Sequence, residues 1–125
     1  MAKESVKAGW LITLGAQSFP VGLFTLGQVG RAFEHLDQAL LPLSQGGLQG
    51  CRQLIAIALE RQLCAQEISD GQSDDQVALL AYERVGAFEG TPEQIVAAVT
   101  TIAHASGLIR LGEPQAGMAT VAGSA

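Results

Sequence analysis

Near the middle of the chain, residues 54–59 read Leu-Ile-Ala-Ile-Ala-Leu, a run that is apolar on nearly every side of a helix. A helix of this kind must be surrounded by other elements. A chain of 125 residues supports one sizeable core but not two. The run therefore predicts a central buried helix over about residues 48–68. A single domain over residues 1–111 packs around it, and the small residues of 112–125 form a tail that does not fold alone.

The N-terminal part predicts a β-hairpin. Residues 10–14 are rich in strand formers, residues 15–18 resemble a turn, and residues 19–24 return. Apolar side chains alternate on both runs, which places them on one face. They are Trp10, Ile12, Leu14, Phe19, Val21 and Leu23. The alternative is that residues 8–30 are helical and broken at Pro20. Although this stretch is uncharged, its glycines, glutamines and proline make it a poor membrane span.

Three segments predict the start of a helix. Thr25–Gln28 and Ser73–Gln76 have the spacing of a capping box, and Thr91–Gln94 places Pro92 at the first helical position. The helix that begins after Thr25 ends near residue 40, the one after Ser73 ends near residue 86, and the one after Thr91 ends before Gly107. On the first helix, apolar residues recur at helical spacing at Leu26, Val29, Phe33, Leu36 and Leu40.

We expect this apolar stripe to face inward and to cover the hairpin, with Gly27 and Gly30 packing closely against it. The hairpin and the first helix should both pack on the central helix. The predicted fold class is thus α+β, an N-terminal β-hairpin followed by a small bundle of about four α-helices.

The sequence shows no set of residues suited to catalysis, to a cofactor or to a metal ion. Cys51 and Cys64 lie on the apolar central segment, where buried thiols are inert. His35 and His104 are isolated. Asp74 and Asp75 lie in the first turn of a predicted helix, where the helix dipole favours acidic residues. A role in general acid–base catalysis is therefore not needed to explain them. The prediction is a non-enzymatic chain without cofactors.

The net charge and the distribution of cations limit the classes of partner that the chain is expected to bind. Seven Lys and Arg against twelve Asp and Glu give a net charge of -5, and the cations are scattered singly from Lys3 to Arg110. Nucleic-acid binding usually needs a basic patch. The expected partner is therefore another protein, and neither nucleic acid nor a membrane. Self-association into a homo-oligomer also remains open.

The order of elements resembles a known family. Residues 12–21 read as strand, tight turn and strand, residues 24–29 (Phe-Thr-Leu-Gly-Gln-Val) as a helix start, and residues 91–95 as the start of a helix that ends at 106–108. This resembles the tail assembly chaperone-type proteins of long-tailed bacteriophages, prophages and gene-transfer agents. The resemblance covers roughly residues 10–110. It departs at residues 69–74, which leaves the subfamily open.

The resemblance implies a non-catalytic protein of the host cytoplasm. Such proteins coat the tape-measure protein, a long apolar helical chain, until tail-tube subunits polymerise around it. No binding residue carries over from the family. From the residues themselves, we expect the partner to bind where the hairpin and the first helix leave apolar surface open. The candidates are Leu23, Phe24, Leu26 and Phe33. The alternative is that all four belong to the core.

Two other functions remain open. The chain would be found in the virion if it were a permanent structural subunit of a phage tail, neck or other assembly, joined through an open strand edge at Pro20. Residues 14–25 and Gln28 also resemble the opening of urease accessory proteins of the F type. That second resemblance covers about fifteen residues, and it implies an all-helical protein nearly twice as long.

Overall fold

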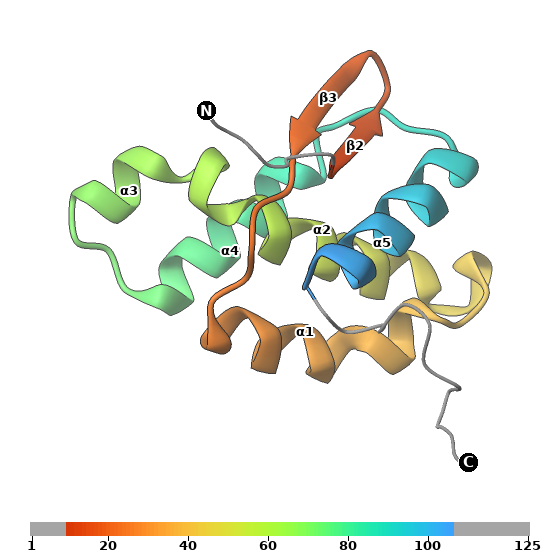
Figure 1. Cartoon of the computed structure of the whole chain (residues 1–125), viewed down its shortest axis with the longest axis horizontal. Helices are drawn as coiled ribbons and strands as arrows, with labels where there is room; N and C mark the ends of the chain where they lie inside the picture. The colour runs from red at the N-terminus through yellow and green to blue at the C-terminus, as the bar shows by residue number, and fades with distance from the viewer. Residues whose placement is uncertain (1–9, 107–125) are drawn as a thin grey trace.

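The computed structural model describes residues 10–106 of the chain. A two-stranded antiparallel hairpin comes first and helices follow, so the predicted α+β fold is confirmed (Figure 1). In chain order the elements are β2 (Leu11–Leu14), β3 (Gln17–Pro20), α1 (Leu26–Ala39), the 3-10 helix η1 (Leu43–Gln45), α2 (Gly47–Leu63), α3 (Ala65–Ser69), α4 (Asp74–Val85) and α5 (Pro92–Ser106). Gly107 and the predicted tail at 112–125 lie outside the described residues.

Helix α2 is the centre of the fold, as its apolar run predicts. Residues 54–60 are all buried, and α1, α4 and α5 all pack against this helix. The helix is shorter than the predicted 48–68, because Cys64 leaves the helical conformation and α3 starts after it. The break frees the carbonyl group of Leu63, which accepts a hydrogen bond from Nη1 of Arg84 on α4. A side chain from a distant helix thus stabilises a break that local periodicity does not indicate.

The hairpin forms where the alternation predicts it, with shorter strands. Its two-residue turn has Gly15 at φ 63°, a conformation that glycine adopts without steric cost. Ile12 is opposite Phe19, and Leu14 is opposite Gln17. Ile12 and Leu14 are buried in the core. The return strand ends at Pro20, so residues 21–24 are not part of the sheet.

The expectation that the first helix covers the hairpin is wrong, since α5 and the segment before it do so. Strand β2 packs against α5. Gln94 of α5 accepts a hydrogen bond from Gly15 N at 2.9 Å and donates one to Gly15 O at 3.1 Å. Phe19 stacks on Phe88 with ring centroids 5.1 Å apart. In the view of Figure 1 the hairpin and α1 lie at opposite sides of the molecule, with α2 and α5 between them.

The inward direction predicted for the apolar stripe of the first helix is also wrong. The buried residues of α1 are Gln28, Ala32 and Ala39. Small side chains on this line let α1 approach α2 closely, because a Cβ atom on Gly50 would lie only 2.4 Å from the backbone nitrogen of Ala39. The bulky residues of the predicted stripe therefore turn outward or lie at the side of the helix.

Gly27 and Gly30 do not pack against the hairpin as expected. Both are exposed, and a Cβ atom on Gly30 would meet no atom within 4 Å. The glycines that allow close packing are instead Gly47 and Gly50 at the start of α2.

The two predicted capping boxes form, and the helix start predicted at Thr91 has the same pair of contacts. In each, the hydroxyl group of the first residue accepts a hydrogen bond from a backbone N–H three residues later, and the glutamine side chain accepts one from the first residue's N–H. These contacts satisfy N–H groups that a helix start otherwise leaves unpaired. Asp74 and Asp75 lie in the first turn of α4, where the helix dipole stabilises them.

Candidate interaction surface

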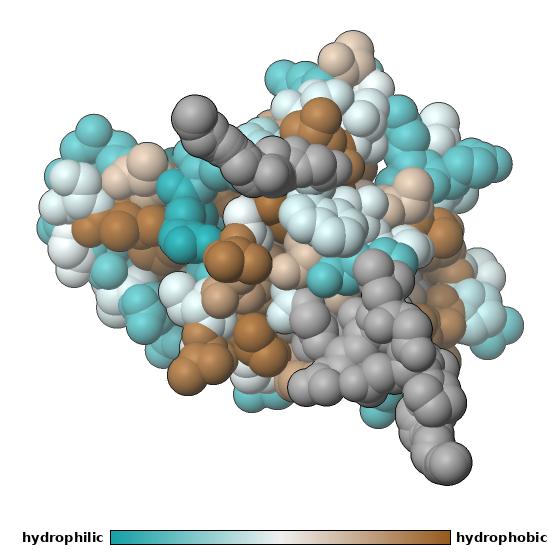
Figure 2. Space-filling model, viewed as in Figure 1, coloured by the Kyte–Doolittle hydropathy of each residue, from teal (hydrophilic) through white to brown (hydrophobic). Residues whose placement is uncertain are grey.

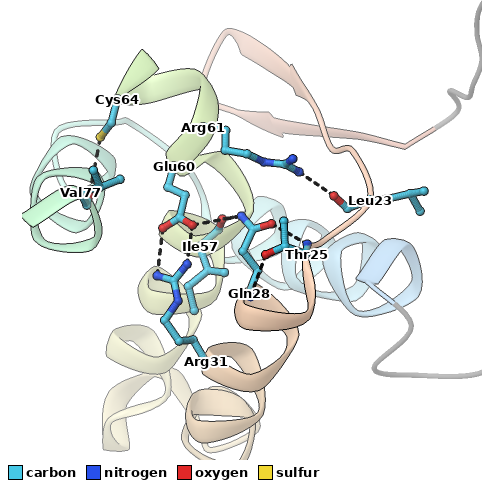
Figure 3. Close-up of polar contacts among 9 residues, drawn as sticks. All are labelled: Leu23, Thr25, Gln28, Arg31, Ile57, Glu60, Arg61, Cys64 and Val77. Carbon is cyan, nitrogen blue, oxygen red and sulfur yellow. Dashed lines mark hydrogen bonds and ion pairs between the residues drawn. The ribbon is translucent and has the colours of Figure 1, made fainter. Parts of the chain in front are cut away.

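A buried polar cluster holds α1 on α2 (Figure 3). Gln28 is only 2 % exposed, and its Nε2 donates to Ile57 O at 3.0 Å and to Glu60 Oε2 at 3.1 Å. Its Oε1 accepts from Thr25 N at 2.9 Å, so one side chain serves both the helix cap and the helix contact. Buried polar groups without such partners would be costly. This cluster fixes which face of α1 turns inward.

The carboxylate of Glu60, 7 % exposed, binds Arg31 in a two-pronged ion pair. The side-chain hydrogen bond to Glu60 raises the pKa of Arg31, although burial acts in the opposite direction. Two nitrogens of the guanidinium are thereby committed to Glu60 within the chain. The positive charge of Arg31 is therefore paired within the chain.

Three large apolar side chains lie along the outer face of α1, and we call them the outer stripe: Leu26, Phe33 and Leu40 at the C-cap. They are 90 %, 58 % and 70 % exposed. Residues seven apart lie almost on one line along a helix, and this line is separate from the line of the buried Gln28, Ala32 and Ala39. Val29 and Leu36 are partly buried beside it. Figure 2 shows apolar side chains gathered over the start of α1 and the segment that leads into it.

Leu23 extends this apolar surface before the helix begins. It is 80 % exposed, while its carbonyl oxygen accepts a hydrogen bond from Arg61 Nη2 at 2.6 Å. Figure 3 shows the Leu23 side chain pointing away from Arg61. The backbone is thus held to α2 while the side chain stays in solvent.

The four sequence-predicted binding residues fall into two groups. Leu23, Leu26 and Phe33 are exposed, whereas Phe24 is partly buried and packs against buried side chains of the core. Phe24 is thus an anchor beneath the surface. Leu40 belongs to the exposed set but was expected to face inward. The seven-residue spacing of Leu26, Phe33 and Leu40 is the sequence signal that groups it with the others.

The two cysteines and His104 lie in packing contacts with other parts of the chain. Both cysteines are free and buried, and their thiols donate to Ala39 O and Val77 O at 3.5 Å and 3.7 Å. Burial raises the pKa of both thiols, which disfavours the reactive thiolate. The His104 ring lies 6.2 Å from that of Trp10. Within residues 10–106, no three His, Cys, Asp or Glu side chains gather as a metal site would need.

A cavity of about 480 Å³ lies between the start of α2, the end of α4 and the end of β2. Its charged wall includes Arg52, whose guanidinium carbon lies 3.9 Å from the centre of the Tyr82 ring. Arg52 Nε also donates to Tyr82 O at 2.9 Å, near the C-terminal end of α4. A cation in that place complements the helix dipole, which accounts for Arg52 without a ligand.

Among the helices of residues 10–106, none combines the length and the apolar character that crossing a membrane requires. No protein-family model matches the chain, and no curated protein or solved structure matches it either.

Proposed function

We propose that this chain is a non-enzymatic protein–protein interaction protein that acts in the assembly of a phage tail or tail-like particle, as a chaperone that binds the tape-measure protein. The observation that carries the interaction role is the outer stripe on α1. The assignment to tail assembly rests on the resemblance of residues 10–110 to tail assembly chaperone-type proteins. These two parts of the proposal are supported separately and are tested separately.

Exposed apolar side chains are common singly, but a set aligned on one helix marks an interaction surface. Leu23, Leu26 and Leu40 each keep at least 70 % of their surface in solvent. Burying a side chain of this size stabilises a complex by about 1.5–3 kcal/mol before the costs of association. The hydrogen bonds of Gln28 and Glu60 hold α1 in place beneath the stripe. A rigid apolar surface of this kind suits a chaperone for an apolar helical chain.

The interaction part is tested by co-expression with a tape-measure protein from the genome that encodes this chain, followed by affinity capture. We expect the wild-type chain to retain the tape measure in the soluble fraction and the double variant Leu26→Ser/Phe33→Ser to lose it. The matched control is Leu79→Ser, since Leu79 is 60 % exposed on α4, away from the stripe. Equal capture by all three chains would refute the stripe as the binding surface.

The tail-assembly part is tested by mass spectrometry of purified particles against the crude lysate of the producing cell. A chaperone is present in the lysate and absent from finished particles. Stoichiometric presence in particles would identify a structural subunit instead and would refute the chaperone role. A producing cell that makes no particles would refute both roles.

The hairpin of the described residues also differs from the all-helical fold implied by the urease accessory resemblance.

A further inference from the structure

We infer that the partner segment bound by the outer stripe is an amphipathic helix whose apolar face is flanked by lysine or arginine side chains. This inference rests on the proposed role of the stripe as a docking surface, and it adds the chemistry of the occupant. Three features of the outer face of α1 support it: the spacing of the apolar side chains, the open glycine positions beside them and the sign of the neighbouring charges.

The spacing favours a helix as the occupant. Side chains seven residues apart form a nearly straight line, which is the pattern that one helix presents to another in a bundle. Leu40 lies fourteen positions after Leu26, and at 1.5 Å per position this is a length of about 21 Å. A partner helix of about four turns matches that length.

The glycines give such a helix room to approach. Gly27 and Gly30 lie on the exposed surface of α1, and the space around Gly30 is empty within 4 Å of a hypothetical Cβ atom. Glycine within an exposed helix weakens it, and nothing else in residues 10–106 packs into the free space at Gly30. Small residues beside an apolar line allow the backbone of a second helix to come close.

The charges beside the stripe are negative. Glu34 and Asp37 are exposed on α1, and neither forms an ion pair within residues 10–106. Asp37 lies between Phe33 and Leu40 on the outer face, one helical turn from each. Arg31 is engaged by Glu60. A partner with cations beside its apolar face complements this surface, whereas a second copy of this chain would bring further carboxylates to it.

The test uses the full chain and two synthetic helical peptides of about sixteen residues, long enough to span the stripe. The peptides share one leucine stripe, flanked by lysine in the first and by glutamate in the second. Fluorescence anisotropy should show about tenfold tighter binding of the lysine peptide at low salt, and the preference should shrink at 1 M salt. The variant Glu34→Lys/Asp37→Lys should reverse the preference. The control Glu83→Lys/Glu89→Lys, which changes net charge equally away from the stripe, should retain it.

The remaining outcomes separate this inference from the proposed function. If both peptides bind equally and Phe33→Ser abolishes that binding, the outer stripe is a docking surface but the inference of a basic partner is wrong. Binding of neither peptide would overturn both. Lysine-peptide binding that survives Leu26→Ser/Phe33→Ser would show attraction to net charge alone and overturn the inference. A dimer of the free chain that Phe33→Ser abolishes in sedimentation would identify a second copy as the occupant, which also overturns it.

Discussion

Helices α1 and α2 both have apolar residues at helical spacing, yet they use them in opposite ways. In α2 the run 54–59 is buried on every side. In α1 Leu26, Phe33 and Leu40 are exposed, and the fully buried line consists of a glutamine and two alanines. The comparison shows that periodicity locates an apolar stripe but does not determine what covers it. Packing between the two helices is decided by small residues and one polar cluster.

The reason for the difference lies at the contact between the helices. A Cβ atom on Gly50 would lie 2.4 Å from Ala39 N, so the helices meet almost backbone to backbone. A leucine or phenylalanine of α1 would not fit in that contact. Gln28, by contrast, reaches Ile57 O and Glu60, and it also completes the helix cap with Thr25. The inner face of α1 is thus selected by fit and by polar partners.

The largest expected change in the free energy of unfolding comes from a substitution in α2. Comparing it with a substitution in the outer stripe tests whether α2 is core and the stripe is surface. Ile55 is 3 % exposed, and Ile55→Ala should lower the free energy of unfolding by about 2–5 kcal/mol through lost burial and a cavity. Phe33→Ala on the outer stripe should change it by less than about 0.5 kcal/mol. Urea denaturation followed by circular dichroism measures both. Similar costs for the two variants would mean that the described face of α1 is wrong.

The sequence predicted some elements of this fold well because their signals are local. The helix starts predicted at Thr25, Ser73 and Thr91 depend only on residue types within four consecutive positions, and all three form. The hairpin follows from alternation and a glycine turn. The break at Cys64 was not predictable in this way, because Arg84 stabilises it from a helix twenty residues further along.

The candidate surface was only partly predictable, for a related reason. The sequence shows that Leu26 and Phe33 share one face of a helix, but either face of that helix is a possible core face. The decisive residues are Gln28, which is buried through partners on α2, and Gly50, which is close to α1. Those contacts join residues far apart in the chain. Phe24, next to Leu23, is partly buried because the segment turns into the helix there.

The second prediction concerns the close contact itself. Gly50→Ala places a methyl group against the backbone of Gln38 and Ala39, at 2.7 Å and 2.4 Å, where no flexible side chain can move away. Forcing the helices apart should cost about 1–3 kcal/mol of unfolding free energy. The urea midpoint should fall accordingly. An unchanged midpoint would contradict the backbone-to-backbone packing of α1 and α2.

A glycine-to-alanine substitution on the outer face of α1 should raise the free energy of unfolding rather than lower it. Gly30→Ala adds a methyl group where no atom lies within 4 Å, and alanine favours a helix over glycine. The expected result is a gain of about 0.5–1 kcal/mol in the unfolding free energy, measured in the same denaturation experiment. If the outer face docks a helix closely, this variant should also bind the lysine-flanked peptide more weakly. A destabilised Gly30→Ala chain would show that this face is covered.

The smallest expected effect lies away from both helix faces, at the ion pair that links α3 to α4. Arg84 donates to both carboxylate oxygens of Glu67, at 3.0 Å and 2.8 Å, and this contact lowers the pKa of Glu67 from 4.5 to about 2. A carboxylate whose pKa is lower in the folded chain stabilises the fold above its unfolded pKa. That contribution is lost as the pH falls from about 4.5 through about 2.

The variant Glu67→Gln should therefore be less stable than the wild type at neutral pH, and the difference should shrink over that acidic range. Denaturation at a series of pH values measures it, with Glu83→Gln as the control, since Glu83 is exposed and forms no ion pair within residues 10–106. Because the pair lies at the surface, raising the salt concentration should reduce the difference as well. A difference that is constant with pH would assign the effect of Glu67 to packing. The break after α2 would then depend on the bond from Arg84 to Leu63 O rather than on the ion pair with Glu67.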